Sequence, residues 1–393
     1  MQSLLINGNN QDLSLAELAS LYGEDNFEVI NNLAISSKLN TENIDFNRLG
    51  GSIKLARIIL ITDYLNWNQV YDEILDFLTK KIEADPLDNK LSFGISIYGL
   101  PKTPKEIITL GFKVKKALAK IKKNIRFIPN QTNSLNAAQV INNKLTSKNN
   151  QELIVLIDNS KLYLANTVQI QDINEYSKRD FKRPYRDSKN GMLPPKLAQI
   201  IINLGAGNAE ITDQTILDPF CGTGVILQEA LLMGASIIGS DINETMIEYS
   251  SKNLKWLSDH FKLENPNIKS LNQSDATIGK WTNFNFVTTE TSLGPPLSYL
   301  PSNSELNHII NNSNQLIVKF LSNLASQISQ GTRLSLAVPI WRTSNGYKRL
   351  PLVDQINDLG YNFVEFNKLN SKDLVYMRNN QFVGRQLLIL TRK

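Results

Sequence analysis

The residues Ile216-Leu217-Asp218-Pro219-Phe220-Cys221-Gly222-Thr223-Gly224 join the end of an apolar run to the start of a helical pattern. The apolar residues before Asp218 indicate a buried strand, and the apolar spacing over residues 225–231 indicates a helix. Glycines at such a strand-to-helix turn let a ligand approach the backbone, because no side chain stands in the way. The turn lacks the third glycine of the dinucleotide fingerprint. This stretch predicts an α/β fold with a ligand-binding turn of another kind.

A second acidic residue ends the next predicted strand. Asp241 follows residues 237–240 and lies 23 residues after Asp218. A carboxylate about 20 residues beyond a glycine turn is placed to accept both hydroxyls of a ribose. Asp275 follows a weaker strand at residues 268–271. An α/β core with incidental acids is the alternative interpretation of this run.

This order of strand, acid, glycine turn, helix, strand and acid resembles S-adenosylmethionine (SAM) methyltransferases. The resemblance implies that the turn packs against the methionine and ribose of SAM and that Asp218 faces its ammonium. Asp241 would hold the ribose, Ile242 would pack on the adenine, and Asp275 would meet the adenine amino group.

The composition excludes several classes of protein. The chain has 393 residues, enough for two or three domains, and is 41% hydrophobic and 20% charged. A single cysteine excludes a disulfide framework, and two histidines argue against a zinc site, so no metal is expected. There is no membrane-spanning apolar run and no secretory signal pattern. We expect a cytoplasmic protein with no membrane partner.

Positive charge is concentrated in two windows. Residues 102–126 hold nine basic residues and one acid, and residues 178–196 hold seven basic residues and two acids. The formal charges of these windows are +8 and +5, so the rest of the chain carries −8. Clustered positive charge on a neutral or acidic background predicts a polyanionic partner. A solvated lysine-rich helix face is the alternative for residues 113–123.

The periodicity of the chain predicts four regions: 1–62, a small α+β domain; 63–172, a second α+β domain; 173–187, a basic linker; and 188–393, the α/β domain. The first of these regions resembles a ferredoxin-like domain. The second domain contains a helix at 104–123, a strand at 125–129, a short helix at 135–143 and a hairpin around Asp158-Asn159-Ser160. These last three features resemble the THUMP module, which implies binding to the acceptor end of tRNA.

The start of the α/β domain carries a longer resemblance. Arg179-Asp180, Arg183-Pro184, Arg186-Asp187 and residues 191–198 (Gly-Met-Leu-Pro-Pro-Lys-Leu-Ala) resemble the tRNA guanosine-10 N2-methyltransferases. In that family this helix covers the SAM pocket. The resemblance implies a Rossmann-like domain with a seven-stranded, mostly parallel sheet whose edge hairpin pairs residues 361–366 with 385–391. The residue pattern itself indicates further helices at 243–257, 306–328 and 351–359. The implied cofactor-binding residues are Met192, Pro194, Asp218, Pro219, Cys221, Gly222, Gly224, Asp241, Ile242 and Asp275.

The predicted catalytic loop follows the strand at residues 286–288. The family carries Asp/Asn-Pro-Pro-Tyr there, where the acid accepts the hydrogens of the target amine and the aromatic ring stacks on the base. This chain has Glu290-Thr291-Ser292-Leu293 instead. We therefore expect Glu290 to act as the acceptor in a rebuilt loop, and Leu293 to pack on the base without ring stacking.

The main hypothesis is a SAM-dependent tRNA methyltransferase acting on an exocyclic amine, most simply guanosine N2 at position 10. The alternatives are a non-catalytic tRNA-binding protein with a retained SAM pocket and a DNA amino-methyltransferase. No DNA partner is expected, and an activator subunit is not excluded. The residues predicted to contact RNA are Arg48, Lys54, Lys113, Lys115, Lys116, Lys120, Lys122, Lys123, Arg126, Arg183 and Arg186.

Overall fold

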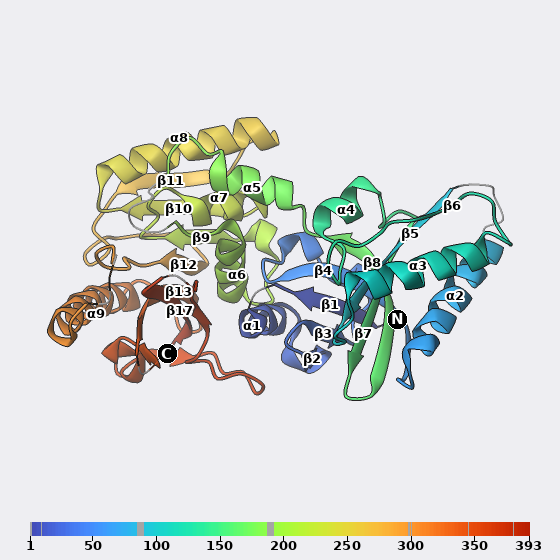
Figure 1. Ribbon diagram of the computed structural model, residues 1–393. Coiled ribbons are helices and arrows are strands. Elements are labelled where there is room, and N and C mark those ends of the chain that lie inside the picture. The colour runs from blue at the N-terminus through green and yellow to red at the C-terminus, as the bar shows by residue number, and fades with distance from the viewer. Residues whose placement is uncertain are drawn as a thin grey trace. The chain divides into compact units, whose positions relative to one another are not determined.

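The computed structural model describes residues 2–8, 10–84, 90–186, 192–297, 299, 301–344, 346–379 and 381–393. The chain divides into two compact units, which Figure 1 shows in colours that follow the chain. The first comprises Met1–Gln11, Asn26–Asn47 and Ser52–Asn174, and the second comprises Asp12–Asp25, Arg48–Gly51 and Glu175–Lys393. Residues 187–191, which comprise the last residue of the predicted linker and the start of the predicted α/β domain, lie outside the described residues.

The first unit is built on one eight-stranded sheet with the order β2-β3-β1-β4-β8-β7-β5-β6. Strand β5 is parallel to β6 and β7, and the other pairs are antiparallel. The predicted boundary after residue 62 falls inside β4, whose long pairing with β8 joins strands from both predicted N-terminal domains. The strands are β1 (Ser3–Asn7), β2 (Phe27–Asn31), β3 (Ala34–Ser37), β4 (Ser52–Asp63), β5 (Leu91–Tyr98), β6 (Ile125–Phe127), β7 (Gln151–Asp158) and β8 (Lys161–Ile170).

Helices α2 (Trp67–Ala84) and α3 (Pro104–Leu118) each bury one apolar stripe in the core of this unit, and α4 (Ala137–Asn142) is short. Helix α3 begins at a capping box, in which the Thr103 side chain accepts from the Glu106 N–H and Glu106 accepts from the Thr103 N–H. The helix ends at Leu118, before the predicted end at residue 123, so the last lysines of the basic window lie beyond it. The early part of the chain also contains three 3₁₀ turns, η1 (Glu24–Asn26), η2 (Thr41–Asn43) and η3 (Phe46–Arg48).

The second unit contains the predicted Rossmann-like sheet. Its strand order is β11-β10-β9-β12-β13-β17-β15, with β14 paired to β13 and β16 paired to β17. The first five strands of this order are parallel, and β17 and β15 form the antiparallel edge that the sequence predicts. The strands are β9 (Thr215–Asp218), β10 (Ser236–Asp241), β11 (Ile268–Gln273), β12 (Phe286–Glu290), β13 (Arg333–Thr343), β14 (Gly346–Lys348), β15 (Tyr361–Phe363), β16 (Val375–Tyr376) and β17 (Val383–Arg392).

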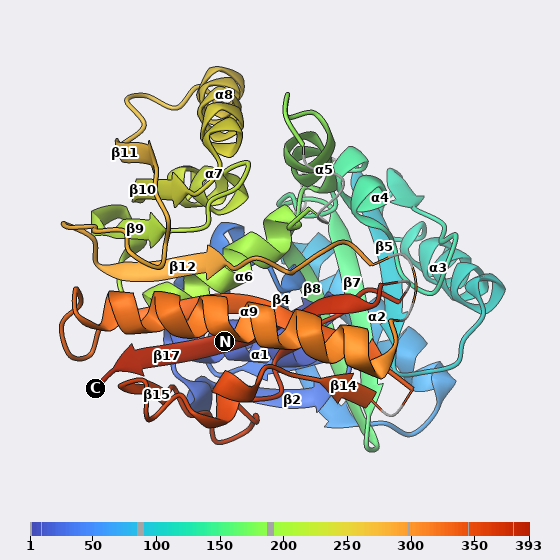
Figure 2. The same cartoon turned by 90° about the vertical axis from the view of Figure 1, so that its left-hand side faces the viewer.

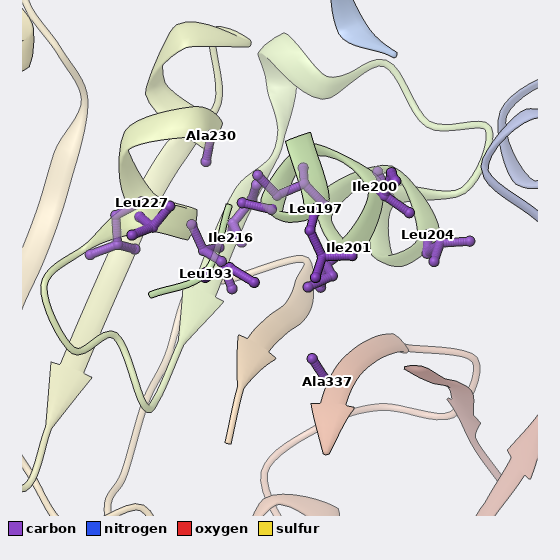
Figure 3. Packing of buried hydrophobic residues seen from close by; sticks show 14 of the residues in the cluster. Leu193, Leu197, Ile200, Ile201, Leu204, Ile216, Leu227, Ala230 and Ala337 are labelled. Atoms are coloured by element: carbon purple, nitrogen blue, oxygen red, sulfur yellow. The ribbon is translucent and has the colours of Figure 1, made fainter. Parts of the chain in front are cut away.

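Helices cover both faces of this sheet (Figure 2). Because side chains alternate along a strand, Ile216 of β9 packs with α6 (Pro195–Ala206), α7 (Val225–Leu232) and α8 (Glu244–Phe261), whereas Leu217 packs with α9 (Asn303–Ala325). Figure 3 shows Leu197 and Ile201 of α6 beside Ile216, and Ala337 of β13 lies below Ile201 in this view; all four belong to one buried cluster. Full burial of each such Leu or Ile side chain is worth about 1.5–3 kcal/mol.

Two short segments from the start of the chain also belong to the second unit. Leu13 and Ala16 of α1 (Gln11–Tyr22) join its core. The buried Glu17 carboxylate accepts from the N–H groups of Gly50 and Gly51, each at 2.9 Å, and from Asn203 Nδ2 at 2.7 Å. This network explains the glycine pair, since a Cβ at Gly50 would come within 2.1 Å of a backbone carbonyl of α6.

Two sequence predictions need correction. The predicted linker at 173–187 contains helix α5 (Ile173–Phe181), and it is ordered because Arg179 Nε donates to the buried Glu229 at 2.7 Å. The predicted helix at 351–359 is only a 3₁₀ turn, η5 (Pro351–Asp354). Another 3₁₀ turn, η4 (Ile211–Asp213), precedes β9. Within the described residues, no helix is both long and apolar enough to span a bilayer.

Candidate active site

A pocket of about 480 Å³ opens at the carboxyl ends of β9, β10 and β12. Three of its acids are the last residues of these strands, Asp218, Asp241 and Glu290. Strand β9 lies between β10 and β12, so the order of the sheet reverses at this point. Open α/β sheets bind ligands in the crevice at such a position. The volume lies in the range of small-molecule sites.

The glycine turn forms one wall of the pocket. Gly222 and Gly224 have φ values of +49° and +82°, a region that glycine enters without strain. A Cβ at Gly222 would meet nothing within 4 Å, so its open side is available to a ligand. A Cβ at Gly224 would lie 2.3 Å from Ser250 Oγ, so Gly224 serves the packing of α8 against the turn.

Asp241 is held by two backbone donors. Its Oδ2 accepts from the Gly222 N–H and its Oδ1 from the Asn243 N–H, both at 2.9 Å. Burial raises the pKa of Asp241 above its ordinary value, while these two hydrogen bonds oppose the rise. Ile242 follows with its side chain 64% exposed along the pocket. Asp275 accepts from the Thr277 N–H and hydroxyl at 2.8 Å, and these bonds lower its pKa.

Asp218 is the most deeply buried acid of the pocket. It is 1% exposed and accepts from Thr289 Oγ1 at 2.6 Å and from the Phe220 N–H at 3.2 Å. Burial raises the pKa of Asp218 to about 8. A positively charged group entering the pocket would restore the ionised form, because an opposite charge nearby favours the charged state of an acid.

The loop after β12 is tied to the neighbouring strand. Glu290 Oε1 accepts from Arg385 Nε of β17 at 2.6 Å, with the two side chains 19% and 2% exposed. Burial raises the pKa of Glu290, although Arg385 and Arg378 act in the opposite direction. The Thr291 N–H donates to the Ala337 carbonyl at 3.0 Å. Proline cannot donate this bond, so Thr291 in place of the family's proline extends the pairing of β12 with β13.

The pocket collects most of the site residues that the sequence predicts. All four loop residues, Glu290 to Leu293, line it, as do the predicted cofactor residues except Pro194 and Gly224. Pro194 caps α6 instead. Sequence reasoning missed Thr289, which holds Asp218, and the pairing of Arg385 with Glu290. Thr289 directly precedes Glu290, so its place at the end of the same predicted strand could have indicated that it lines the site. Arg385 lies 95 residues from Glu290, and no nearby residue in the sequence indicates that the two side chains meet.

Two of the predicted RNA contacts are wrong because the side chains are buried. Lys54 is 3% exposed and pairs with Glu152, and Arg183 is 3% exposed and lines the pocket. Arg48 is half-buried and donates to Asn203 Oδ1 at 2.7 Å. Lys115 and Lys122 are half-buried. The remaining predicted contacts are exposed: Lys113, Lys116, Lys120, Lys123, Arg126 and Arg186.

The residues of the pocket fit SAM. Among the described residues that line it, four carboxylates (Asp218, Asp241, Asp275 and Glu290) face one guanidinium, that of Arg183. This excess of negative charge favours a cationic ligand such as a sulfonium. The open side of Gly222 admits a ligand close to the backbone, and Arg183 keeps two buried donor atoms without hydrogen-bond partners among the described residues.

Comparisons with known families agree with this fold. A family profile described as DNA methylase matches residues 63–252, and one described as methyltransferase domain matches residues 211–337. Two solved structures cover nearly the whole chain: TrmN from Thermus thermophilus (TM-score 0.50, 15% identity, 100% of both chains) and a possible methylase from Clostridium difficile (TM-score 0.51, 14% identity, 98% of this chain and 97% of the other). The fold is that of a Rossmann-like SAM methyltransferase with an α+β unit before it.

Curated relatives share part of the sequence. A tRNA (guanine(10)-N2)-dimethyltransferase of Methanothermobacter thermautotrophicus is 30% identical over 161 residues, which are 41% of this chain and 42% of that protein. Proteins of the same name from Pyrococcus abyssi and Methanocaldococcus jannaschii are 40% and 34% identical, over 22% and 26% of this chain and 22% and 28% of theirs. The chain therefore matches less than half the length of these relatives.

Proposed function

We propose that this chain is a SAM-dependent methyltransferase that acts on an exocyclic amine of a tRNA nucleoside, with guanosine N2 at position 10 as the first candidate. The observation that carries the proposal is the single pocket that joins Asp218, Asp241 and Asp275 to Glu290. The names and sequence identities of the curated relatives support tRNA as the substrate.

The chemistry follows from what these residues are able to do. SAM supplies an electrophilic methyl group when it is bound. Asp241 and Asp275 would hold its nucleoside, and Glu290 would accept hydrogens of the target amine, which keeps the nitrogen lone pair available. Arg385 fixes the position of Glu290, because Arg385 Nε donates a hydrogen bond to Glu290 Oε1. The target base has to leave its helical stack to reach the pocket, and Leu293 would then pack against it.

The first unit, which contains the THUMP-like region predicted at 63–172, is the proposed RNA-binding part. Its basic residues on α3 and beyond, Lys113, Lys116, Lys120, Lys123 and Arg126, are exposed to solvent. Lys113 also lies over the Tyr71 ring, 4.0 Å from its centroid, which fixes one cation of this surface. Contacts of this kind to phosphates position a nucleic acid without reading its sequence.

The direct test is transfer of label from radioactive SAM to unmodified tRNA transcripts, with nucleosides mapped by mass spectrometry. We expect one labelled guanosine with the wild-type chain. Asp241→Ala should weaken SAM binding by roughly 10-fold or more, because hydrogen bonds to a charged acceptor are worth about 1.5–3 kcal/mol each. The binding loss is measured by equilibrium dialysis.

The exposed Asp259 of α8 provides a matched control, since Asp259→Ala removes one carboxylate outside the pocket. SAM and tRNA binding without label in any transcript would support a non-catalytic binder. The profile described as DNA methylase makes duplex DNA a necessary second acceptor in the assay. Label in DNA and none in tRNA would overturn the proposed substrate.

Charge reversal on the basic surface should weaken tRNA binding. Lys116, Lys120 and Lys123 are exposed and are replaced together by glutamate. If each contacts a phosphate, affinity at low salt should fall at least about 10-fold and the slope of log K against log[salt] should drop by about 3. Filter binding across a salt series measures both quantities.

The control carries the same change of charge elsewhere on the first unit, at Lys38, Lys144 and Lys148, which are also exposed. An equal loss in both triple variants would mean that only overall charge matters. Unchanged affinity in the first variant would remove this surface from the RNA-binding site.

A further inference from the structure

Arg183 is a buried cation in the wall of the pocket. It follows α5 by two residues and is 3% exposed. It lines the pocket together with Met192, Leu193 and the glycine turn. Burial lowers the pKa of Arg183, but an arginine side chain in a protein stays protonated. The fold therefore buries a positively charged guanidinium in the pocket wall.

Two donors of this guanidinium have no hydrogen-bond partner among the described residues. They are Nε and Nη2, and both are fully shielded from solvent. Asp180 and Glu229 attract the charge of Arg183, but neither accepts a hydrogen bond from it, and Glu229 Oε1 is bound by Arg179 at 2.7 Å. A buried donor without a partner costs about 1–3 kcal/mol, and more when it is charged. Such a cost is offset when a ligand supplies the acceptor.

The position of the two free donors on the side chain defines the acceptor. Nε–H and Nη2–H lie parallel on one edge of the planar guanidinium, and that edge binds both oxygens of a carboxylate at once. The other charged residues described in the pocket wall are the carboxylic acids Asp218, Asp241, Asp275 and Glu290. Arg183 is therefore the one basic residue described in the pocket wall that attracts an anionic group.

We propose that Arg183 binds the carboxylate at the methionine end of SAM through Nε and Nη2, an inference that rests on the proposed function. The same end of SAM carries an ammonium, for which Asp218 is the deeply buried acid of the pocket. Arg183 and Asp218 thus provide one charge of each sign for an amino-acid group. This role replaces the RNA contact predicted for Arg183.

The test compares ligands that differ in this carboxylate alone. Decarboxylated SAM keeps the sulfonium and the amine, and 5′-methylthioadenosine lacks the whole amino-acid end. By calorimetry we expect wild-type protein to bind SAM roughly 10- to 100-fold more tightly than decarboxylated SAM. Arg183→Met should remove this preference, because it weakens the binding of SAM and leaves the binding of decarboxylated SAM unchanged. Arg183→Lys should retain part of the preference, because lysine keeps the positive charge but cannot donate two parallel hydrogen bonds to the carboxylate.

Three controls separate this inference from other outcomes. Equal binding of 5′-methylthioadenosine to all variants shows that the pocket is folded, and Lys182→Met removes an exposed cation of the same segment that does not line the pocket. No preference for the carboxylate in the wild type, or an equal loss for both ligands in Arg183→Met, overturns the role of Arg183. Absence of binding of any SAM-like ligand to the wild type instead overturns the proposed function.

Discussion

Replacing Glu290 by glutamine should lower the kcat of methyl transfer by about 10²- to 10⁴-fold, the contribution of a positioned proton-accepting group. Glutamine has nearly the same shape, but it presents one acceptor oxygen and a donor where the carboxylate presents two acceptors. Arg385 Nε donates to Oε1 of Glu290. In the variant, the glutamine can point its oxygen at Arg385 and its NH₂ at the substrate, or it can point its oxygen at the substrate and lose the hydrogen bond from Arg385. Either orientation impairs acceptance of the amine hydrogens. Single-turnover kinetics with saturating SAM measure the effect.

The partner of Glu290 gives this prediction a pH signature. Arg385 lowers the pKa of Glu290 while burial raises it, so Arg385→Met should raise that pKa further. A larger fraction of Glu290 is then protonated at neutral pH, and the rate of the variant should recover as pH rises through the new pKa. Glu290→Gln has no carboxylate at this position, so its rate should show no such recovery.

Arg378→Met is the matched control. Arg378 is exposed and acts on Glu290 only through its charge, so its removal should shift the profile less than the loss of Arg385. A wild-type kcat in the Glu290→Gln variant would show that Glu290 has no part in catalysis. An identical pH profile in the wild type and Arg385→Met would restrict Arg385 to a structural role.

The α/β domain was predictable because its signals are local. The run from Ile216 to Gly224 contains a strand, a turn and the start of a helix, and each depends on residues only a few positions apart. Asp241 and Glu290 lie at strand ends, and parallel strands bring their carboxyl ends to one edge of a sheet. These short rules suffice to place the acids of the pocket together.

The errors concern long side chains whose partners are distant in sequence. Lys54 meets Glu152 because β4 pairs with β8 and β8 with β7, and Arg385 meets Glu290 across β13. Neither partner is visible before the strand order is known. Arg183 and the helix of Arg179 were assigned to a basic linker because composition counts charges without showing which are buried. Charge clustering thus marked the exposed lysines of α3 and did not separate them from the buried Arg179 and Arg183.

Removal of one partner from the buried ion pair in the first unit should destabilise this unit strongly. Lys54 and Glu152 are 3% and 0% exposed, and Lys54 Nζ also donates to the Leu135 carbonyl at 2.9 Å. Ser96 Oγ and Thr167 Oγ1 each donate to Glu152 at 2.6 Å. Lys54→Met leaves the carboxylate charged and buried without its cation, which should lower the free energy of opening by about 3–5 kcal/mol. Hydrogen exchange of the β4, β7 and β8 amides in the full chain measures this loss.

A second variant separates the unpaired charge from the lost packing. Lys54→Met combined with Glu152→Gln removes both charges while an amide oxygen still accepts from Ser96 or Thr167. Because breaking a buried pair costs more than replacing it, the double variant should recover a large part of the stability lost in Lys54→Met. Lys161→Met provides the surface comparison, since Lys161 pairs with Asp63 where both are exposed, and it should cost less than about 1 kcal/mol. Equal exchange rates in Lys54→Met and Lys161→Met would mean that burial of the pair contributes nothing to the first unit.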